Sequence, residues 1–151
     1  MNSKLIDNLG YKRLMEHGIK PSVQRLAVIN YLIIHRTHPT ADSIFNDLSK
    51  LMPTLSRTTV YNTLKLLSEK AAILTLTIDE KNCRYDAGIE PHSHFRCVAC
   101  GDIKDLPVAP SKIKDNYLDN CIILDTELYL YGYCPKCTVD NNKYLGVEND
   151  N

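Results

Sequence analysis

The chain has 151 residues, of which 44% are hydrophobic and 24% charged, a composition typical of a folded globular protein rather than a disordered one. Its 18 basic and 18 acidic residues cancel, and no apolar run approaches the roughly 20 residues needed to cross a bilayer. The first residues carry no apolar segment of the signal-peptide kind, so we expect a cytoplasmic protein with no membrane partner.

The charge is divided unevenly along the chain. Residues 1–78 hold ten basic and five acidic residues, a net charge of +5, whereas residues 79–151 hold eight and thirteen, a net charge of −5. A basic half followed by an acidic half favours a first half that faces nucleic acid. Chance clustering of solvated side chains is the plainer alternative.

Four helices are predicted in the first half, because apolar residues recur there at helical spacing. They cover residues 3–17, residues 23–35, a stretch from Thr40 to Leu51, and a stretch from Ser56 to about Lys70. Gly18 is placed to end the first helix. Ser22, Thr40 and Ser56 have side chains that cap a helix N-terminus, so they are expected to start the other three.

The predicted fourth helix has two different faces. At 100° per residue, its apolar positions Val60, Leu64 and Leu67 fall on one side and face a core. The other side and the first turn carry groups that can reach phosphates and base edges, namely Arg57, Thr58, Tyr61, Asn62 and Lys65. Lys20 and Arg25 are expected near phosphates as well. Two helices joined by a turn indicate a helix-turn-helix when the second helix carries a polar and basic outer face. The alternative is that this face is an ordinary solvated helix surface.

Short strands follow the helices. Residues 73–78 and 83–86, separated by a polar turn, predict a hairpin, which after a recognition helix is the wing of a winged helix. Further strands are predicted at residues 95–97, 103–106 and 121–131, with a helix at 111–118 and a frayed tail after residue 139. The predicted fold class is therefore α+β. A winged helix-turn-helix DNA-binding domain covers residues 1–84, a hinge about 85–91, and a small α/β domain 88–151.

Two Cys-x-x-Cys pairs carry the strongest chemical signal. Cys97 and Cys100, together with Cys134 and Cys137, can supply the four thiolates of a closed tetrahedral zinc site. Six cysteines without an export signal favour metal ligation over disulfides. The other two cysteines, at positions 83 and 121, have no partner in these pairs. A free cysteine is most often a small buried hydrophobic residue, so we assign them no function, with a thiol-based redox role as the alternative.

Two histidines lie just before the first cysteine pair. His92 and His94 flank Ser93 on a predicted strand, so their side chains share one face. They cannot belong to the closed cysteine site and therefore indicate a second metal. One alternative is a zinc metalloenzyme with an open metal position, although no phosphate-binding loop or evident general base accompanies the histidines. Another is a zinc-stapled protein-interaction module that does not bind DNA.

Seven short motifs follow one another along the chain. They are His38-Pro-Thr-Ala-Asp42, Thr59-Val-Tyr-Asn-Thr-Leu64, Arg84-Tyr-Asp86, His92-x-His94, Cys97-x-x-Cys-Gly101, Asp105 and Tyr131-Gly-Tyr-Cys-Pro-Lys-Cys137. Each motif alone is weak, but the combination and its order are specific. Over roughly residues 15–138 the chain resembles the ferric uptake regulator (Fur) superfamily and, within it, the peroxide-responsive repressors (PerR).

This resemblance implies a homodimeric, metal-dependent repressor of double-stranded operator DNA, rather than an enzyme with a small-molecule substrate. It implies that the second domain mediates dimerisation and is stapled by a structural Zn²⁺ on the two cysteine pairs. A regulatory Fe²⁺ or Mn²⁺ would be held by His38, Asp86, His92, His94 and Asp105. Imidazoles and carboxylates without a thiolate suit those metals. The resemblance further implies that peroxide acting on the iron form oxidises His38 or His92.

Three positions favour the peroxide-responsive group. Pro91 and Ser93 stand where iron-sensing Fur proteins often carry ligands of a further metal site, and no histidine follows His94. Asp105 stands where those proteins tend to carry Glu. An iron-responsive, Fur-type repressor of iron uptake is the alternative, and zinc- or nickel-sensing relatives are a further one.

Overall fold

The structure is a computed structural model, and it describes residues 3–108, 121–122 and 124–138. The chain forms two compact units, Met1–Glu90 and Pro91–Asn151. No helix among the described residues has both the length and the apolar character that a membrane span requires. The predicted helix at 111–118 and the predicted tail after 139 lie outside the described residues. The predicted domain bounds and hinge stay a prediction.

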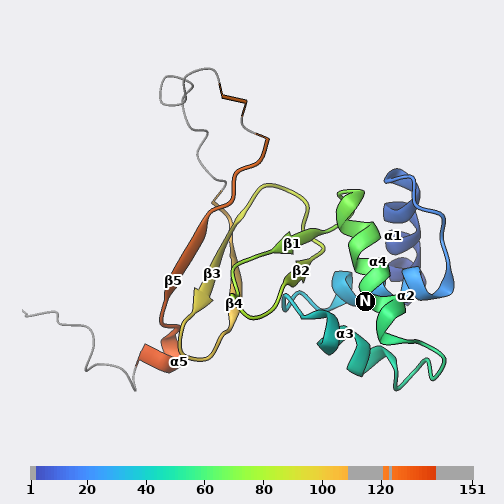
Figure 1. The fold of residues 1–151 in the computed structure, drawn as a ribbon, viewed down its shortest axis with the longest axis horizontal. Coiled ribbons are helices and arrows are strands. Elements are labelled where there is room, and N and C mark those ends of the chain that lie inside the picture. Colours follow the sequence, from blue (N-terminus) through green and yellow to red (C-terminus); the bar gives the residue numbers. More distant parts are fainter. Residues whose placement is uncertain (1–2, 109–120, 123, 139–151) are drawn as a thin grey trace, which may run out of the picture. The chain divides into compact units, whose positions relative to one another are not determined.

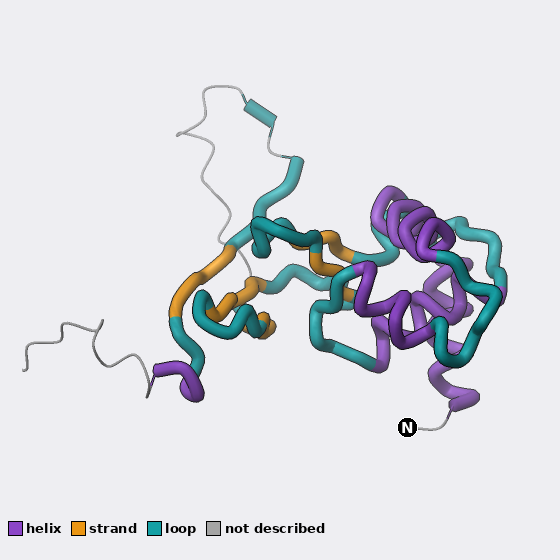
Figure 2. Tube along the Cα trace, turned by 60° about the horizontal axis from the view of Figure 1, so that its bottom comes forward, coloured by secondary structure: helices purple, strands orange, loops and turns teal. Residues whose placement is uncertain are grey.

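The first unit consists of four helices followed by a hairpin (Figures 1 and 2). Its elements are α1 (Ser3–Glu16), α2 (Val23–Ile34), α3 (Ala41–Leu48), α4 (Arg57–Glu69), β1 (Leu74–Leu76) and β2 (Arg84–Asp86). The two strands pair antiparallel, with Thr75 opposite Tyr85. Helices α3 and α4 with the hairpin after them form a winged helix-turn-helix, which confirms the predicted fold class.

Local capping explains where three of these helices begin. Ser22, Thr40 and Ser56 each accept the backbone N–H of the residue three positions later, at 3.3, 3.1 and 3.0 Å. Each has an extended backbone, as an N-cap residue does. All three predicted caps are confirmed.

Helix α1 ends in a Schellman motif around Gly18. Gly18 has φ +65°, and its N–H donates to the carbonyl of Met15 at 3.1 Å. The N–H of Ile19 donates to the carbonyl of Leu14 at 2.8 Å, and both of these side chains are buried. The two hydrogen bonds satisfy carbonyls that the end of the helix would otherwise leave unpaired.

One apolar core holds the first unit together. Its buried members include Leu14, Val28, Ile29, Leu32, Ile44, Val60, Leu64, Leu67 and Ile73. The three apolar positions predicted for the inner face of α4 are among them. Leu51, however, is 81% exposed, so the prediction that the third helix and its apolar spacing continue to this residue is wrong. Helix α3 ends at Leu48, and the chain leaves it in a turn in which the N–H of Leu51 donates to the Leu48 carbonyl at 3.0 Å.

Within its described residues, the second unit is a small sheet with one short helix (Figure 1). Its elements are β3 (Ser93–Cys97), β4 (Ile103–Leu106), β5 (Tyr129–Gly132) and α5 (Pro135–Thr138). The strand order is β4-β3-β5, with β3 antiparallel to β4 and parallel to β5. Among its described residues, the buried hydrophobic side chains are Cys97, Ile103 and Cys134, so apolar burial alone supplies little core.

The strand predicted at 121–131 is wrong over most of its length. Of the residues that the structure describes there, only those of Tyr129–Gly132 form a strand, and Ile122 is 85% exposed. The register between β5 and β3 explains why the strand is shorter than predicted. Tyr129 pairs with His94 near the start of β3, so the described residues before Tyr129 run past the end of their partner strand. Strand propensity without a partner does not produce a strand.

Candidate functional site

The four paired cysteines form one compact cluster in the second unit. Their Sγ atoms all lie within 4.8 Å of one another, and those of Cys100 and Cys134 are 3.8 Å apart. A tetrahedral site with zinc–sulfur bonds of about 2.3 Å requires sulfur atoms about 3.8 Å apart. The backbone N–H of Cys134 donates to Cys97 Sγ at 3.3 Å. The predicted ligands therefore fit a closed zinc site in both number and spacing.

Electrostatics in this cluster favour a bound cation. The backbone N–H groups of Cys100 and Cys134 stabilise the thiolate of Cys97 and lower its pKa to about 6. Cys137 behaves in the opposite way, because hydrogen bonding with Cys134 and then with Cys100 raises its pKa to about 12. Four adjacent thiols cannot all ionise by themselves, whereas a divalent cation offsets the charge of four thiolates.

His38 and Asp86 come together in the first unit. His38 follows α2 and Asp86 ends β2, and both side chains are buried. His38 Nε2 lies 3.9 Å from Asp86 Oδ2. The N–H of Gly88 donates to Asp86 Oδ1 at 2.8 Å and orients the carboxylate. His38 and Asp86, an imidazole and a carboxylate at this distance, are two of the five predicted ligands.

The second unit holds the other three predicted ligands. His94 on β3 pairs with Asp105 on β4, so their side chains share one face of the sheet. The Nε2 atoms of His92 and His94 lie 3.5 and 3.6 Å from Asp105 Oδ1, and the two rings are 4.4 Å apart. Tyr129 lies opposite His94 on β5, with ring centroids 6.2 Å apart. No motif in the sequence indicates that Tyr129 lies beside His94, because this proximity depends on the register between β3 and β5.

The predicted DNA-contacting face of α4 is exposed. Its side chains are those of Arg57, Thr58, Tyr61, Asn62 and Lys65. Lys20 is exposed and Arg25 half-buried, with Arg25 Nη1 donating to the Lys20 carbonyl at 2.6 Å. None of these positions is covered by the core of the first unit.

Arg57 has intramolecular partners that the sequence did not indicate. Its Nη1 forms an ion pair with the carboxylate of Asp42 on α3. Its guanidinium also lies over the ring of Phe45, 4.7 Å from the ring centroid. These contacts join the first turn of α4 to α3, so Arg57 is an element of the helix-turn-helix itself as well as a predicted DNA contact.

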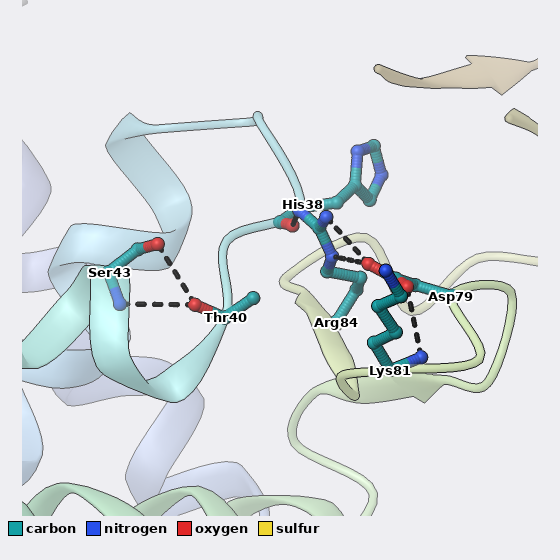
Figure 3. A network of polar contacts seen from close by, with 6 residues as sticks. All are labelled: His38, Thr40, Ser43, Asp79, Lys81 and Arg84. Atoms are coloured by element: carbon teal, nitrogen blue, oxygen red, sulfur yellow. Dashed lines mark hydrogen bonds and ion pairs between the residues drawn. The ribbon is translucent and has the colours of Figure 1, made fainter. Parts of the chain in front are cut away.

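An ion pair in the hairpin reaches the backbone of His38 (Figure 3). Arg84 Nε and Nη2 donate to Asp79 Oδ2 at 2.9 and 2.7 Å, and Arg84 Nη1 donates to the His38 carbonyl at 3.3 Å. In the sequence, Arg84 belongs to one of the seven motifs, whereas Asp79 belongs to none. No local pattern could have found the link, because 46 residues separate Arg84 from His38.

The two remaining cysteines do not behave as expected. Cys83 and Cys121 are both exposed, so the expectation of small buried side chains is wrong. Cys83 lies in the hairpin turn just before β2, and Cys121 precedes the exposed residues before β5.

The sequence is similar to those of known proteins. The model of the ferric uptake regulator family matches residues 16–131. The peroxide-responsive repressor PerR of Staphylococcus aureus strain Mu50 is 32% identical over 127 residues, which cover 82% of this chain and 86% of that protein. The PerR of strain USA300 is 31% identical over the same length.

Solved structures share the fold. The Helicobacter pylori ferric uptake regulator Fur aligns with a TM-score of 0.65 at 20% identity, over 91% of this chain and 95% of that one. A zinc uptake regulator in complex with zinc and DNA aligns with a TM-score of 0.65 at 16% identity, over 94% of this chain and 99% of that one. With the family match over most of its length, the chain belongs to the ferric uptake regulator family of metal-dependent transcriptional regulators.

Proposed function

We propose that this protein is a homodimeric repressor that binds operator DNA when metal-loaded and releases it when peroxide oxidises a metal ligand. The observation that carries the proposal is the 32% identity to a peroxide-responsive repressor across 82% of the chain. The donor set is consistent with it, because the candidate regulatory ligands are imidazoles and carboxylates and include no thiolate.

Cys97, Cys100, Cys134 and Cys137 would hold a structural Zn²⁺. The spacing of their Sγ atoms suits a closed tetrahedral site, which leaves no position for a substrate. The second unit has few buried apolar residues among those described, so much of its folding free energy would come from the metal. The exposed Leu130 and Tyr131 on β5 support a second copy of the chain as its partner.

The regulatory metal, Fe²⁺ or Mn²⁺, would take its ligands from both units. His38 and Asp86 would supply one part of the set, and His92, His94 and Asp105 the other. Bound Fe²⁺ supplies the redox chemistry that peroxide needs. The imidazoles of His38 and His92 would hold the metal and would be the groups open to oxidation, and an oxidised imidazole is a poorer ligand.

Metal binding would be linked to DNA binding through the arrangement of the two units. One ion held by ligands from both units favours one arrangement, and in a homodimer that arrangement sets the spacing of the two α4 helices. Arg57, Thr58, Tyr61 and Asn62 would then face base edges, while Lys20, Arg25 and Lys65 would face phosphates. Loss of a metal ligand would allow the two units to take other arrangements, and DNA binding would weaken as a result.

Mass spectrometry after brief exposure to peroxide tests this function. We expect one added oxygen on the peptide containing His38 or His92 in the Fe²⁺-loaded protein, together with loss of operator binding. The Mn²⁺-loaded protein should bind DNA and remain unmodified. His35 is an exposed histidine three residues before His38 and provides a matched control. The His35→Ala protein should respond to peroxide like the parent.

Two results would contradict the proposal. Oxidation of Cys83 or Cys121, with both histidines and DNA binding intact, would exclude histidine-based sensing. Release of DNA on removal of iron alone, with no oxidised residue, would indicate an iron-responsive repressor instead.

A further inference from the structure

His38 has a backbone conformation that its sequence disfavours. Its φ is +49°, in the left-handed region that residues other than glycine rarely adopt. The next residue is Pro39, and a proline normally pushes the preceding residue into an extended conformation. A buried histidine held in this way persists only where its surroundings fix the backbone.

The hairpin provides the contacts that fix it. Arg84 Nη1 donates to the carbonyl oxygen of His38 at 3.3 Å. One residue further along β2, the N–H of Tyr85 donates to the carbonyl of Pro39 at 3.1 Å. The backbone on either side of the peptide bond between His38 and Pro39 is therefore hydrogen-bonded to one strand of the wing.

Arg84 is itself held in place by Asp79. Two guanidinium nitrogens donate to the same carboxylate oxygen, at 2.9 and 2.7 Å, while the third donates to His38. The other carboxylate oxygen accepts the N–H of Lys81 at 3.1 Å. The side chain of Asp79 is only 5% exposed and that of Arg84 22% exposed, so water competes little for this pair.

We propose that Asp79 and Arg84 are positioning residues that aim the imidazole of His38 at the regulatory metal. The inference rests on the proposed function, in which His38 is a ligand. In Figure 3 the carbonyl side of His38 faces Arg84, while its imidazole points away from the ion pair. The pair therefore holds the main chain of the ligand through its carbonyl oxygen.

The chemistry of the bridge requires arginine. A guanidinium presents several donors in a rigid plane, so one side chain can bind the carboxylate and a carbonyl at once. A lysine in the same place keeps the positive charge but lacks that fork. Arg84→Lys therefore removes the bridge to His38 while preserving charge, which makes it the sharper test variant.

The test measures Mn²⁺ affinity by calorimetry on the zinc-loaded, full-length protein. We expect Arg84→Lys to weaken Mn²⁺ binding about tenfold or more, as the loss of a residue that orients a metal ligand commonly does. Asp79→Asn should act in the same direction. Lys81→Ala is the matched control in the same turn, because only its backbone N–H takes part, and its affinity should stay within about twofold of the parent.

A second background separates positioning from general support of the hairpin. In a His38→Ala protein there is no ligand to position, so Arg84→Lys should change the residual Mn²⁺ affinity by less than about twofold. Thermal unfolding and zinc content, measured on each variant, report whether the fold is kept. If Arg84→Lys fails to fold, Asp79→Asn carries the test with the same thresholds.

Any of three results would contradict the inference. Parent-like Mn²⁺ affinity in Arg84→Lys would show that His38 needs no such support. Equal weakening in both backgrounds would show that the pair merely stabilises the hairpin. A His38→Ala protein with parent-like affinity would remove His38 from the metal site altogether, and the proposed function would fail with the inference.

Discussion

At the scale of single residues, backbone conformation decides what a position tolerates. Gly18 and His38 both have positive φ, but for different reasons. Gly18 ends a helix, where glycine adopts the left-handed conformation at little cost. His38 has the same kind of backbone with a full side chain, so hydrogen bonds from elsewhere in the fold must hold it.

The substitution Gly18→Ala isolates the free-energy cost of placing a residue with a Cβ in the left-handed conformation. A Cβ at this position meets no atom within 4 Å, so crowding contributes nothing. A left-handed residue with a Cβ costs roughly 1–2 kcal/mol, and we expect the free energy of unfolding of the first unit to fall by about that amount. Urea unfolding followed by circular dichroism measures it.

A neighbouring variant controls for local changes in the same turn. Glu16→Ala removes an exposed side chain and leaves the cap intact, so its stability should stay within about 0.5 kcal/mol of the parent. A Gly18→Ala protein as stable as the parent would show that the helix end can relax out of the left-handed conformation.

At the scale of elements, α4 combines a buried and an exposed function. Its inner face is part of the core, while its outer face is free of that core. Lys65 is on the outer face, where it lies 3.8 Å from Glu69 one turn later. An exposed pair of this kind adds little stability, so the lysine is available for a phosphate.

Substitution of Lys65 by alanine should weaken DNA binding to a similar extent for every sequence. Loss of one phosphate contact should lower the salt dependence of binding by about one unit of slope. Lys12→Ala is the matched control, because Lys12 has the same i,i+4 arrangement with Glu16 on α1, at 3.6 Å. Fluorescence anisotropy over a range of salt concentrations provides the measurement.

Tyr61 serves as the comparison for sequence reading. Tyr61→Ala should reduce discrimination between operator and random DNA more than it reduces affinity for random DNA, because an aromatic ring can contact thymine methyl groups. Unchanged slopes and unchanged discrimination in both variants would remove α4 from the DNA interface.

Elements also show how far sequence reasoning reaches. The helix caps at Ser22, Thr40 and Ser56 were predictable because each depends on residues three positions away. The cysteine cluster was predictable because ligand spacing is itself a local signal. The strand at 121–131 was not, because its extent depends on where its partner β3 begins. The link from Asp79 and Arg84 to His38 was hidden for the same reason, since tertiary structure alone brings it together.

At the scale of the whole molecule, the two units differ in what stabilises them. The first has an apolar core drawn from all four helices and from the segment entering the hairpin. The second, within its described residues, buries few hydrophobic side chains apart from two of its cysteines. We therefore expect the second unit to depend on its metal and its partner copy in a way the first does not.

Cys134→Ser tests that dependence. The parent should hold about one zinc per chain as a dimer, whereas the variant should lose zinc and sediment as a monomer with an intact first unit. Cys121→Ser is the control, because Cys121 is exposed and stands outside the cluster, and it should keep both zinc and the dimer. Full zinc content in a dimeric Cys134→Ser protein would contradict the structural role of the site.

The parallel pairing of β3 with β5 has a consequence for the order of events in folding. Cys97 pairs with Gly132, so the two strands end at the same edge of the sheet. This brings together the two Cys-x-x-Cys pairs, whose first cysteines, Cys97 and Cys134, are 37 residues apart in the sequence. Closing a loop of that length costs roughly 3–4 kcal/mol of chain entropy. Before closure, a chain offers the metal two thiolates rather than four. The rate of tight zinc uptake should therefore report how fast β5 pairs with β3, and a stopped-flow chelator assay would time the most distant of the described strand pairings.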